Sequence, residues 1–269
     1  EAWLDWEAGK KIKVIICGSS NRFFDENVGG EEKILRGLKT TADIWIKPFS
    51  PRILKKYYFP KWNDQEILLT MMFTGGVPYY LNKIPSKRPF IEAINTAFFT
   101  QKTIFLSEID EILNLEFNGK GIVNARLLLS ALGLRGKSQK QLSELTGLSD
   151  STVSDAIDKL VRFCLVDVKN KSKYDTRKNS NGDIYIISDP FLFFHLQILE
   201  PLAQKIESNI KGQIFSYNVL YGSSYYIPEF SGEAFELLVR SIVNHKFCET
   251  PNAIANELQL FEAPPILIS

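Results

Sequence analysis

The chain of 269 residues has few of the residues that build metal sites and disulfide frameworks. It contains three cysteines, Cys17, Cys164 and Cys248, and two histidines, His195 and His245. The cysteines are far apart in the sequence and lie among apolar residues, so we expect buried, reduced thiols rather than disulfides or metal ligands. Without a cluster of cysteines and histidines, a zinc site is not expected.

Long apolar runs and a strong charge of either sign are also absent. No window approaches the roughly 18 consecutive apolar residues of a membrane span, and the first residues have the features of neither a signal nor a transit peptide. We therefore expect a cytoplasmic protein with no membrane partner. The formal net charge of +1 means that any basic footprint for nucleic acid must be local. The 45% hydrophobic share is that of a folded globular protein.

The first fifty residues have the pattern of a β-α-β unit. Residues 11–17 form a short, mostly apolar run that predicts a buried parallel strand leading into a loop. Residues 42–48 predict a second strand, which Pro48 ends. A β-α-β unit requires a larger sheet than this segment supplies. The chain also lacks an initiating Met, so we expect it to be a piece of a longer protein whose remaining strands precede Glu1.

Residues 51–117 have a helical pattern throughout. Ser50 and Pro51 form an N-cap followed by proline at the first helical position. Further along, apolar residues recur at spacings of three to four, which predicts core-facing stripes. The members of these stripes are Phe90, Ile91, Ile94, Phe98, Leu106, Ile109, Ile112 and Leu113.

The most informative stretch of this helical region is a Gly-Gly-Val-Pro corner. Gly75 and Gly76 are expected to stop a helix over 64–73, and Pro78 suits the first turn of the next helix. The corner is unusually apolar, which predicts that it packs against something larger. Its apolar residues are Val77, Tyr79, Tyr80 and Leu81.

Residues 118–190 have the element order of a winged-helix domain. Ser138 and Gln141 form a capping box, and Gly147 lies in the short turn of a helix-turn-helix. The expected elements are helices over 125–132, 139–146 and 151–163, followed by strands over 165–168 and 184–187 around a long polar wing.

This domain carries candidate residues for contacts with DNA. The outward face of its second helix-turn-helix element and the wing offer hydroxyl and basic side chains suited to phosphates and base edges. They are Ser151, Thr152, Ser154 and Lys159 on the helix, and Lys171, Lys173, Arg177 and Lys178 on the wing. Asp150, Asp155 and Asp158 oppose this role. Residues 121–190 hold eleven Lys/Arg and eight Asp/Glu, a modest surplus, so a protein-interaction module is the alternative.

The motifs described above, taken in their order along the chain, resemble those of archaeal and bacterial AAA+ (STAND-type) ATPases with a C-terminal winged helix and a restriction-endonuclease-like tail. Residues 13–20 resemble the sensor strand, residues 44–50 a strand ending in Pro-Phe-Ser, and residues 74–81 the lid signature. The resemblance implies an α/β remnant of a P-loop-type parallel sheet followed by a mainly α lid and a winged-helix (α+β) domain. The implied domains are 1–50, 51–117, 118–190 and a helical connector with a truncated nuclease-like region over 191–269.

The resemblance also implies a nucleotide site. Ser19 is the sensor candidate, and the implied cofactor-binding residues are Gly18, Ser19, Gly76 and Pro78. In the family an arginine finger, which stabilises phosphate charge during phosphoryl transfer, stands where this sequence has Leu38. The candidates for that role here are therefore only Arg36 and Lys39.

ATP and Mg²⁺ are the cofactors that the resemblance implies for a full-length protein. This sequence has neither a Gly-x-x-x-x-Gly-Lys-Ser/Thr loop nor the acidic strand, so residues 1–269 alone are not expected to bind nucleotide tightly or hydrolyse it. Glu236 matches the opening glutamate of the nuclease-like tail, but no metal-binding Asp and Glu-x-Lys follow.

Two classes of function follow from the sequence. One is an ATP-dependent regulatory switch coupled to a winged helix, whose partners include DNA, a second copy of the chain or a missing ATPase portion. The other is a winged-helix DNA-binding regulator or interaction module without ATPase activity.

Overall fold

The computed structural model describes residues 47–117, 119–133, 136–169, 183–208, 214 and 232–239. The chain divides into two compact units, Glu1–Ile44 and Trp45–Ser269, and every described residue belongs to the second. The predicted parallel sheet, with its candidate residues Gly18, Ser19, Arg36 and Lys39, lies outside the described residues.

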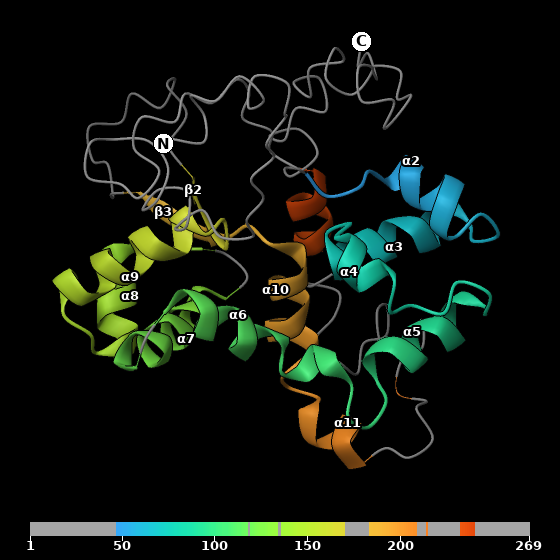
Figure 1. The fold of residues 1–269 in the computed structure, drawn as a ribbon. Helices are drawn as coiled ribbons and strands as arrows, with labels where there is room; N and C mark the ends of the chain where they lie inside the picture. Colours follow the sequence, from blue (N-terminus) through green and yellow to red (C-terminus); the bar gives the residue numbers. More distant parts are fainter. Residues whose placement is uncertain are drawn as a thin grey trace, which may run out of the picture. The chain divides into compact units, whose positions relative to one another are not determined.

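The described residues are mainly helical, with one small antiparallel sheet (Figure 1). In chain order the elements are α2 (Pro51–Ile53), η2 (Leu54–Tyr58), α3 (Asp64–Thr74), α4 (Pro78–Leu81), α5 (Phe90–Phe98), η3 (Ile104–Leu106), α6 (Glu108–Glu116), α7 (Lys120–Leu132), β1 (Lys137–Ser138), α8 (Gln139–Thr146), α9 (Asp150–Arg162), β2 (Val166–Lys169), β3 (Ile184–Ile187), α10 (Pro190–Phe194), η4 (His195–Leu199) and α11 (Ala203–Ser208). Residues 232–239 are also helical. Among these helices, none has the length and apolarity needed to cross a membrane.

Residues 47–117, called here the helical segment, follow their local sequence signals closely. Ser50 caps α2, with Pro51 in its first turn, as predicted. The backbone of Gly75 adopts the left-handed conformation, with φ of 60°, and ends α3. Pro78 stands at the start of α4. These signals act within three or four residues, which is why they could be found without tertiary information.

Large aromatic side chains fill the core of the helical segment. Phe59 and Trp62 stack with ring centroids 4.1 Å apart, and Trp62 meets Phe90 edge to face at 5.1 Å. Phe73 and Phe98 are fully buried. Burial of this much apolar surface is the main stabilisation available to short helices, which are marginal in isolation.

Residues 120–187, called here the helix–sheet module, combine three helices with a three-stranded sheet. The strand order is β1-β3-β2 and both pairings are antiparallel. Lys137 lies opposite Tyr185, and Val166 lies opposite Ile187. The predicted helices and strands of this module are confirmed to within a few residues. Strand β1 was missed, because two residues are too short to display an alternating pattern.

Three expectations about individual residues or segments need correction. Cys164 is exposed rather than buried, because it occupies the turn after α9 with a positive φ of 59°. Tyr79, in the apolar corner, is 49% exposed, whereas Tyr80 and Leu81 are buried as expected. The helical connector expected from residue 191 onward is interrupted between η4 and α11. Cys17 and Cys248 lie outside the described residues.

Candidate functional site

The Gly-Gly-Val-Pro corner contacts two segments that are distant in sequence. A Cβ atom placed on Gly76 would lie 2.3 Å from the carbonyl oxygen of Phe49, well inside the contact distance. A Cβ atom on Gly75 would lie 3.2 Å from Cδ of Pro190. Both glycines also have positive φ, 60° and 77°. The two glycines therefore allow the backbone to turn and let neighbouring chain approach closely.

The backbone groups of Gly76 are used inside the protein. Its carbonyl accepts a hydrogen bond of 2.9 Å from the amide of Phe49, and its amide donates to the hydroxyl of Thr74 at 3.2 Å. The hydroxyl of Thr74 donates in turn to the Thr70 carbonyl at 2.7 Å. The Pro-Phe-Ser stretch and the Gly-Gly-Val-Pro corner are thus hydrogen-bonded to each other. That Gly76 and Pro78 also contact nucleotide stays a prediction.

Helix α10 connects the helix–sheet module to the corner. Only Ser188 and Asp189 separate β3 from α10. The carboxylate of Asp189 caps the helix by accepting a 2.6 Å hydrogen bond from the Leu192 amide. Desolvation raises the pKa of this carboxyl, against the effect of its backbone hydrogen bonds. Pro190 then places its ring over Gly75, so the end of the sheet and the corner meet at one residue.

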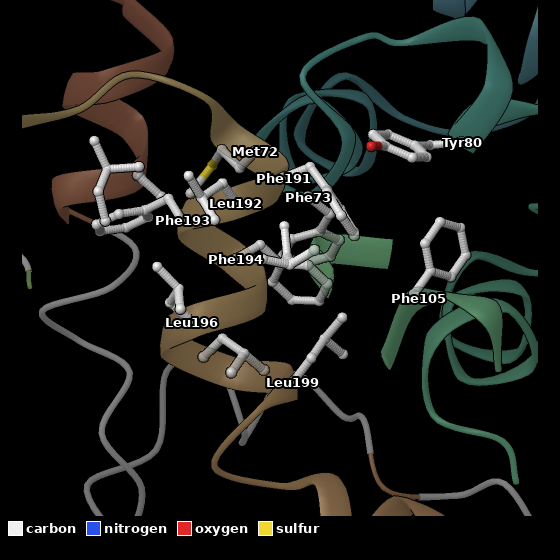
Figure 2. Close-up of a cluster of buried hydrophobic side chains, with 14 of the residues drawn as sticks. Met72, Phe73, Tyr80, Phe105, Phe191, Leu192, Phe193, Phe194, Leu196 and Leu199 are labelled. Atoms are coloured by element: carbon white, nitrogen blue, oxygen red, sulfur yellow. The ribbon is translucent and has the colours of Figure 1, made fainter. Parts of the chain in front are cut away.

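The side chains of α10 enter the aromatic core of the helical segment (Figure 2). Phe194 stacks on Phe73 of α3 with centroids 4.5 Å apart. Phe191 lies 4.3 Å from the ring of Tyr80 in α4 and 5.6 Å from that of Phe105. All five rings are buried, so α10 belongs to the core of the helical segment although it follows the sheet in sequence.

Arg126 of α7 forms a second connection between the module and its surroundings. Its guanidinium group bonds to the carboxylate of Asp110 in α6 and to that of Glu200, which follows η4, the latter at 2.8 Å. The arginine side chain is about one-third exposed. Two carboxylates on one guanidinium give a charge-assisted link whose geometry is directional. Nothing local in the sequence indicated this role, because the partners lie 16 and 74 positions away.

His195 is buried beside this arginine network. Its Nδ1 donates a 3.0 Å hydrogen bond to the carbonyl of Phe105. Burial lowers the pKa of His195 below its ordinary value of 6.5 and outweighs the opposing effects of the Phe105 carbonyl and Glu200. Arg126 lowers the pKa further, and Asp110 raises it. The imidazole is therefore neutral in the folded protein at neutral pH.

This neutral histidine predicts a pH-dependent stability. Below about pH 6.5 the unfolded chain binds a proton at His195 that the folded chain does not, so the free energy of unfolding should fall as the pH drops. The measurement is urea unfolding between about pH 7.5 and about pH 5.5. His195→Asn keeps a side-chain N–H for the Phe105 carbonyl but does not titrate, so the variant should lose this part of the pH dependence. Identical pH profiles for the two proteins would contradict the prediction.

The helix α9 presents part of the predicted DNA face. Ser151 is exposed, and Thr152 and Ser154 are partly exposed at the same end of the helix. Lys159 lies two turns further on, with its Nζ 5.9 Å from the ring centroid of Phe117. The structure therefore brings three of the four helix candidates together and places Lys159 near the end of α6.

Hydrogen bonds hold the start of α9 against α8. Ser149 caps α9, and its hydroxyl lies 2.8 Å from that of Thr152 and 3.0 Å from that of Ser151. Gln139 donates to the Asp150 carbonyl at 2.9 Å, and Ser143 donates to the carboxylate of Asp150 at 2.5 Å. One acidic residue that was counted against DNA binding is therefore used to orient the two helices.

The remaining predicted site residues are those of the expected wing and Glu236. Lys171, Lys173, Arg177 and Lys178, which were assigned to the wing from the sequence, lie outside the described residues. Glu236 is exposed on the helix of residues 232–239. Within the described ranges, no three His, Cys, Asp or Glu side chains are grouped so as to hold a metal ion.

Comparison with known proteins finds a distant archaeal relative. The chain is 26% identical over 200 residues to an uncharacterized protein, MJECL04, of Methanocaldococcus jannaschii. The matched region covers 74% of this chain and 44% of the relative, so the chain spans less than half of the relative's length. No protein-family model and no solved structure matches the chain. The match assigns neither a family nor an activity.

Proposed function

We propose that the described residues are the lid and the winged helix of an ATP-dependent regulatory switch of the AAA+ (STAND) class. In this proposal the helical segment is the lid, the helix–sheet module is the winged helix, and α10 transmits movement between them. ATP and Mg²⁺ would be held by a phosphate-binding loop outside this sequence together with Gly18 and Ser19, with Arg36 or Lys39 as a finger. The bound nucleotide would supply the free-energy difference between two lid positions.

The observation that carries this proposal is the contact of Pro190 with Gly75. The ring of Pro190 covers the glycine corner, and two residues earlier the chain leaves β3. A rotation of the corner would therefore displace the start of α10 and, with it, the end of the central strand β3. The hydrogen bond between Phe49 and Gly76 supports the same interpretation, because it joins the last residues of the proposed nucleotide-binding domain to the lid.

Hydrogen exchange tests this coupling in the protein as its gene encodes it. Adding ATP and Mg²⁺ should change the exchange rates of the amides in residues 75–81 and 184–187 together. In the variant Pro190→Ala, nucleotide should still affect residues 75–81 but have less effect on residues 184–187. Pro201→Ala is the matched control, because Pro201 is exposed. Exchange rates that do not respond to nucleotide at either place would refute the switch.

A winged-helix regulator that binds DNA without an ATPase cycle is the second candidate. It is favoured by the exposed start of α9 and by five Lys/Arg among residues 169–178. Asp155 and Asp158, both exposed on α9, oppose it, and exposed apolar side chains such as Val123 (66%) and Leu145 (61%) fit a protein partner instead.

A measurement of salt-dependent duplex binding decides whether the helix–sheet module binds DNA or a protein partner. If the wing contacts DNA, replacing Lys171, Lys173, Arg177 and Lys178 with glutamine should reduce the slope of log affinity against log salt by about 0.9 for each phosphate that is no longer neutralised. Lys140→Gln is the control, because this lysine is 84% exposed on α8, away from the wing sequence. Absence of duplex binding at low salt would favour the protein-interaction module.

A further inference from the structure

The charges of the helical segment are strongly segregated along the chain. Residues 47–88 contain eight Lys/Arg and two Asp/Glu, whereas residues 89–117 contain one lysine and five Asp/Glu. The whole chain has a formal net charge of only +1. A local positive surplus of this size in a nearly neutral chain is the electrostatic footprint expected of a surface for a polyanion.

Residues 47–88 contain two basic parts, residues 52–61 and residues 87–88. Tertiary contacts bring these two parts together at Trp62. The indole N–H of Trp62 donates a 3.1 Å hydrogen bond to the carbonyl of Arg88. The ammonium group of Lys55 donates to the carbonyl of Trp62. The loop before α5 is thereby held against η2 and the turn that follows it. The basic residues of both parts are consequently close to one another in the fold.

The carboxylates near this face are used by other basic residues or by a helix cap. Asp64 pairs with Lys55 at 3.4 Å, and Glu92 pairs with Arg88 at 2.8 Å. Glu66 completes the capping box of α3 with Asn63. Apart from Lys83, whose ammonium lies over the ring of Tyr79, four exposed basic side chains of residues 47–88 have no carboxylate within ion-pair distance among the described residues. They are Arg52, Lys56, Lys61 and Lys87.

An aromatic ring stands among these cations. Tyr57 is 62% exposed, and the ammonium of Lys56 lies 4.9 Å from its ring centroid. The apolar surface of an exposed ring stays in contact with water unless a partner stacks on it, and stacking is then favourable. Cations that follow a backbone of phosphates, together with an aromatic side chain on which a base can stack, form the usual platform for single-stranded nucleic acid.

We propose that Arg52, Lys56, Tyr57, Lys61 and Lys87 form a binding surface for single-stranded nucleic acid, called here the basic surface. The lysines and the arginine contact phosphates, and Tyr57 stacks on a base. This surface belongs to the helical segment, so its residues are different from those of the α9 face and from the wing lysines and arginine. It does not depend on the switch mechanism, nor on duplex binding by the module.

Fluorescence anisotropy of a labelled oligothymidylate of about 20 nucleotides, titrated with the full chain, tests the proposal. The combined variant Lys56→Glu, Lys61→Glu and Lys87→Glu should weaken binding by about tenfold or more and reduce the salt slope by about 2, which corresponds to three phosphate contacts. Tyr57→Ala should weaken binding by about 5- to 100-fold with little change in the salt slope. Lys140→Glu is the charge control and should leave the affinity within about twofold.

Further measurements keep the outcome decisive. The substituted side chains are exposed, so urea midpoints should stay unchanged. If the triple reversal fails to fold, the corresponding Lys→Gln variant should still reduce the affinity and the slope. The wing variants should leave single-strand binding intact, which separates this surface from the module. The proposal is overturned by absence of binding at low salt, by equal loss in Lys140→Glu, or by competition from polyglutamate as effective as that from unlabelled oligonucleotide.

Discussion

Replacing Gly76 with alanine is expected to lower the free energy of unfolding by about 3–5 kcal/mol, at the high end for a single substitution. The new Cβ would lie 2.3 Å from the Phe49 carbonyl oxygen, and backbone cannot move aside as the end of a flexible side chain can. Relief of this overlap would stretch the 2.9 Å hydrogen bond between Phe49 and Gly76. Urea unfolding monitored by circular dichroism measures the loss.

Gly147→Ala is the matched control for this prediction. Gly147 also has a positive φ, 69°, but a Cβ there would meet no atom within 4 Å. Its replacement should therefore cost only the left-handed backbone strain, about 1–2 kcal/mol. Equal losses for Gly76→Ala and Gly147→Ala would mean that the close approach of Phe49 contributes nothing to the cost.

Truncation of Phe194 to alanine should cost about 3–5 kcal/mol, because the phenyl group leaves a cavity in the core. The ring is 1% exposed, stacks on Phe73 at 4.5 Å and meets Phe98 edge to face at 5.3 Å. Figure 2 shows it directed from α10 into the helical segment. Since α10 is the first element after the sheet, the loss should also loosen the connection between module and corner.

Two measurements distinguish this effect from a general one. Phe235 is 49% exposed in the helix of residues 232–239, and Phe235→Ala should change the unfolding free energy by about 0.5 kcal/mol or less. In Phe194→Ala, hydrogen exchange should accelerate first in residues 190–199 and 64–74. Uniform acceleration across the module as well would indicate that α10 is not a distinct link but part of a single cooperative core.

The elements were predictable wherever a signal acts over a few residues. Ser138 with Gln141, Ser50 with Pro51, and Gly75 before Pro78 each determine a helix end through contacts with their nearest neighbours. Strand β1 escaped prediction, because it exists only by pairing with β3. Cys164 escaped because its apolar neighbours suggested burial, whereas the turn geometry points it outward.

The candidate sites were predictable to a lesser degree. The hydroxyl-rich start of α9 follows from helical periodicity, so Ser151, Thr152 and Ser154 could be placed on one face. Lys159 shares that face by spacing, yet it lies near Phe117. The basic surface could not be identified from residues 52–61 alone. Its other member, Lys87, is brought close to them by the hydrogen bond between Trp62 and the Arg88 carbonyl.

By itself the sequence determined the helical character of residues 51–117, the order of elements in the module, and the glycine corner, since capping, turn chemistry and apolar spacing operate locally. Only the tertiary structure decided what the corner touches and what joins the module to it. Three contacts depend on how the chain packs. Pro190 lies against Gly75, Arg126 bonds to Glu200 across 74 positions, and His195 bonds to the Phe105 carbonyl across 90 positions. Such contacts leave no periodic trace in a sequence, because each partner is set by the arrangement of the whole core.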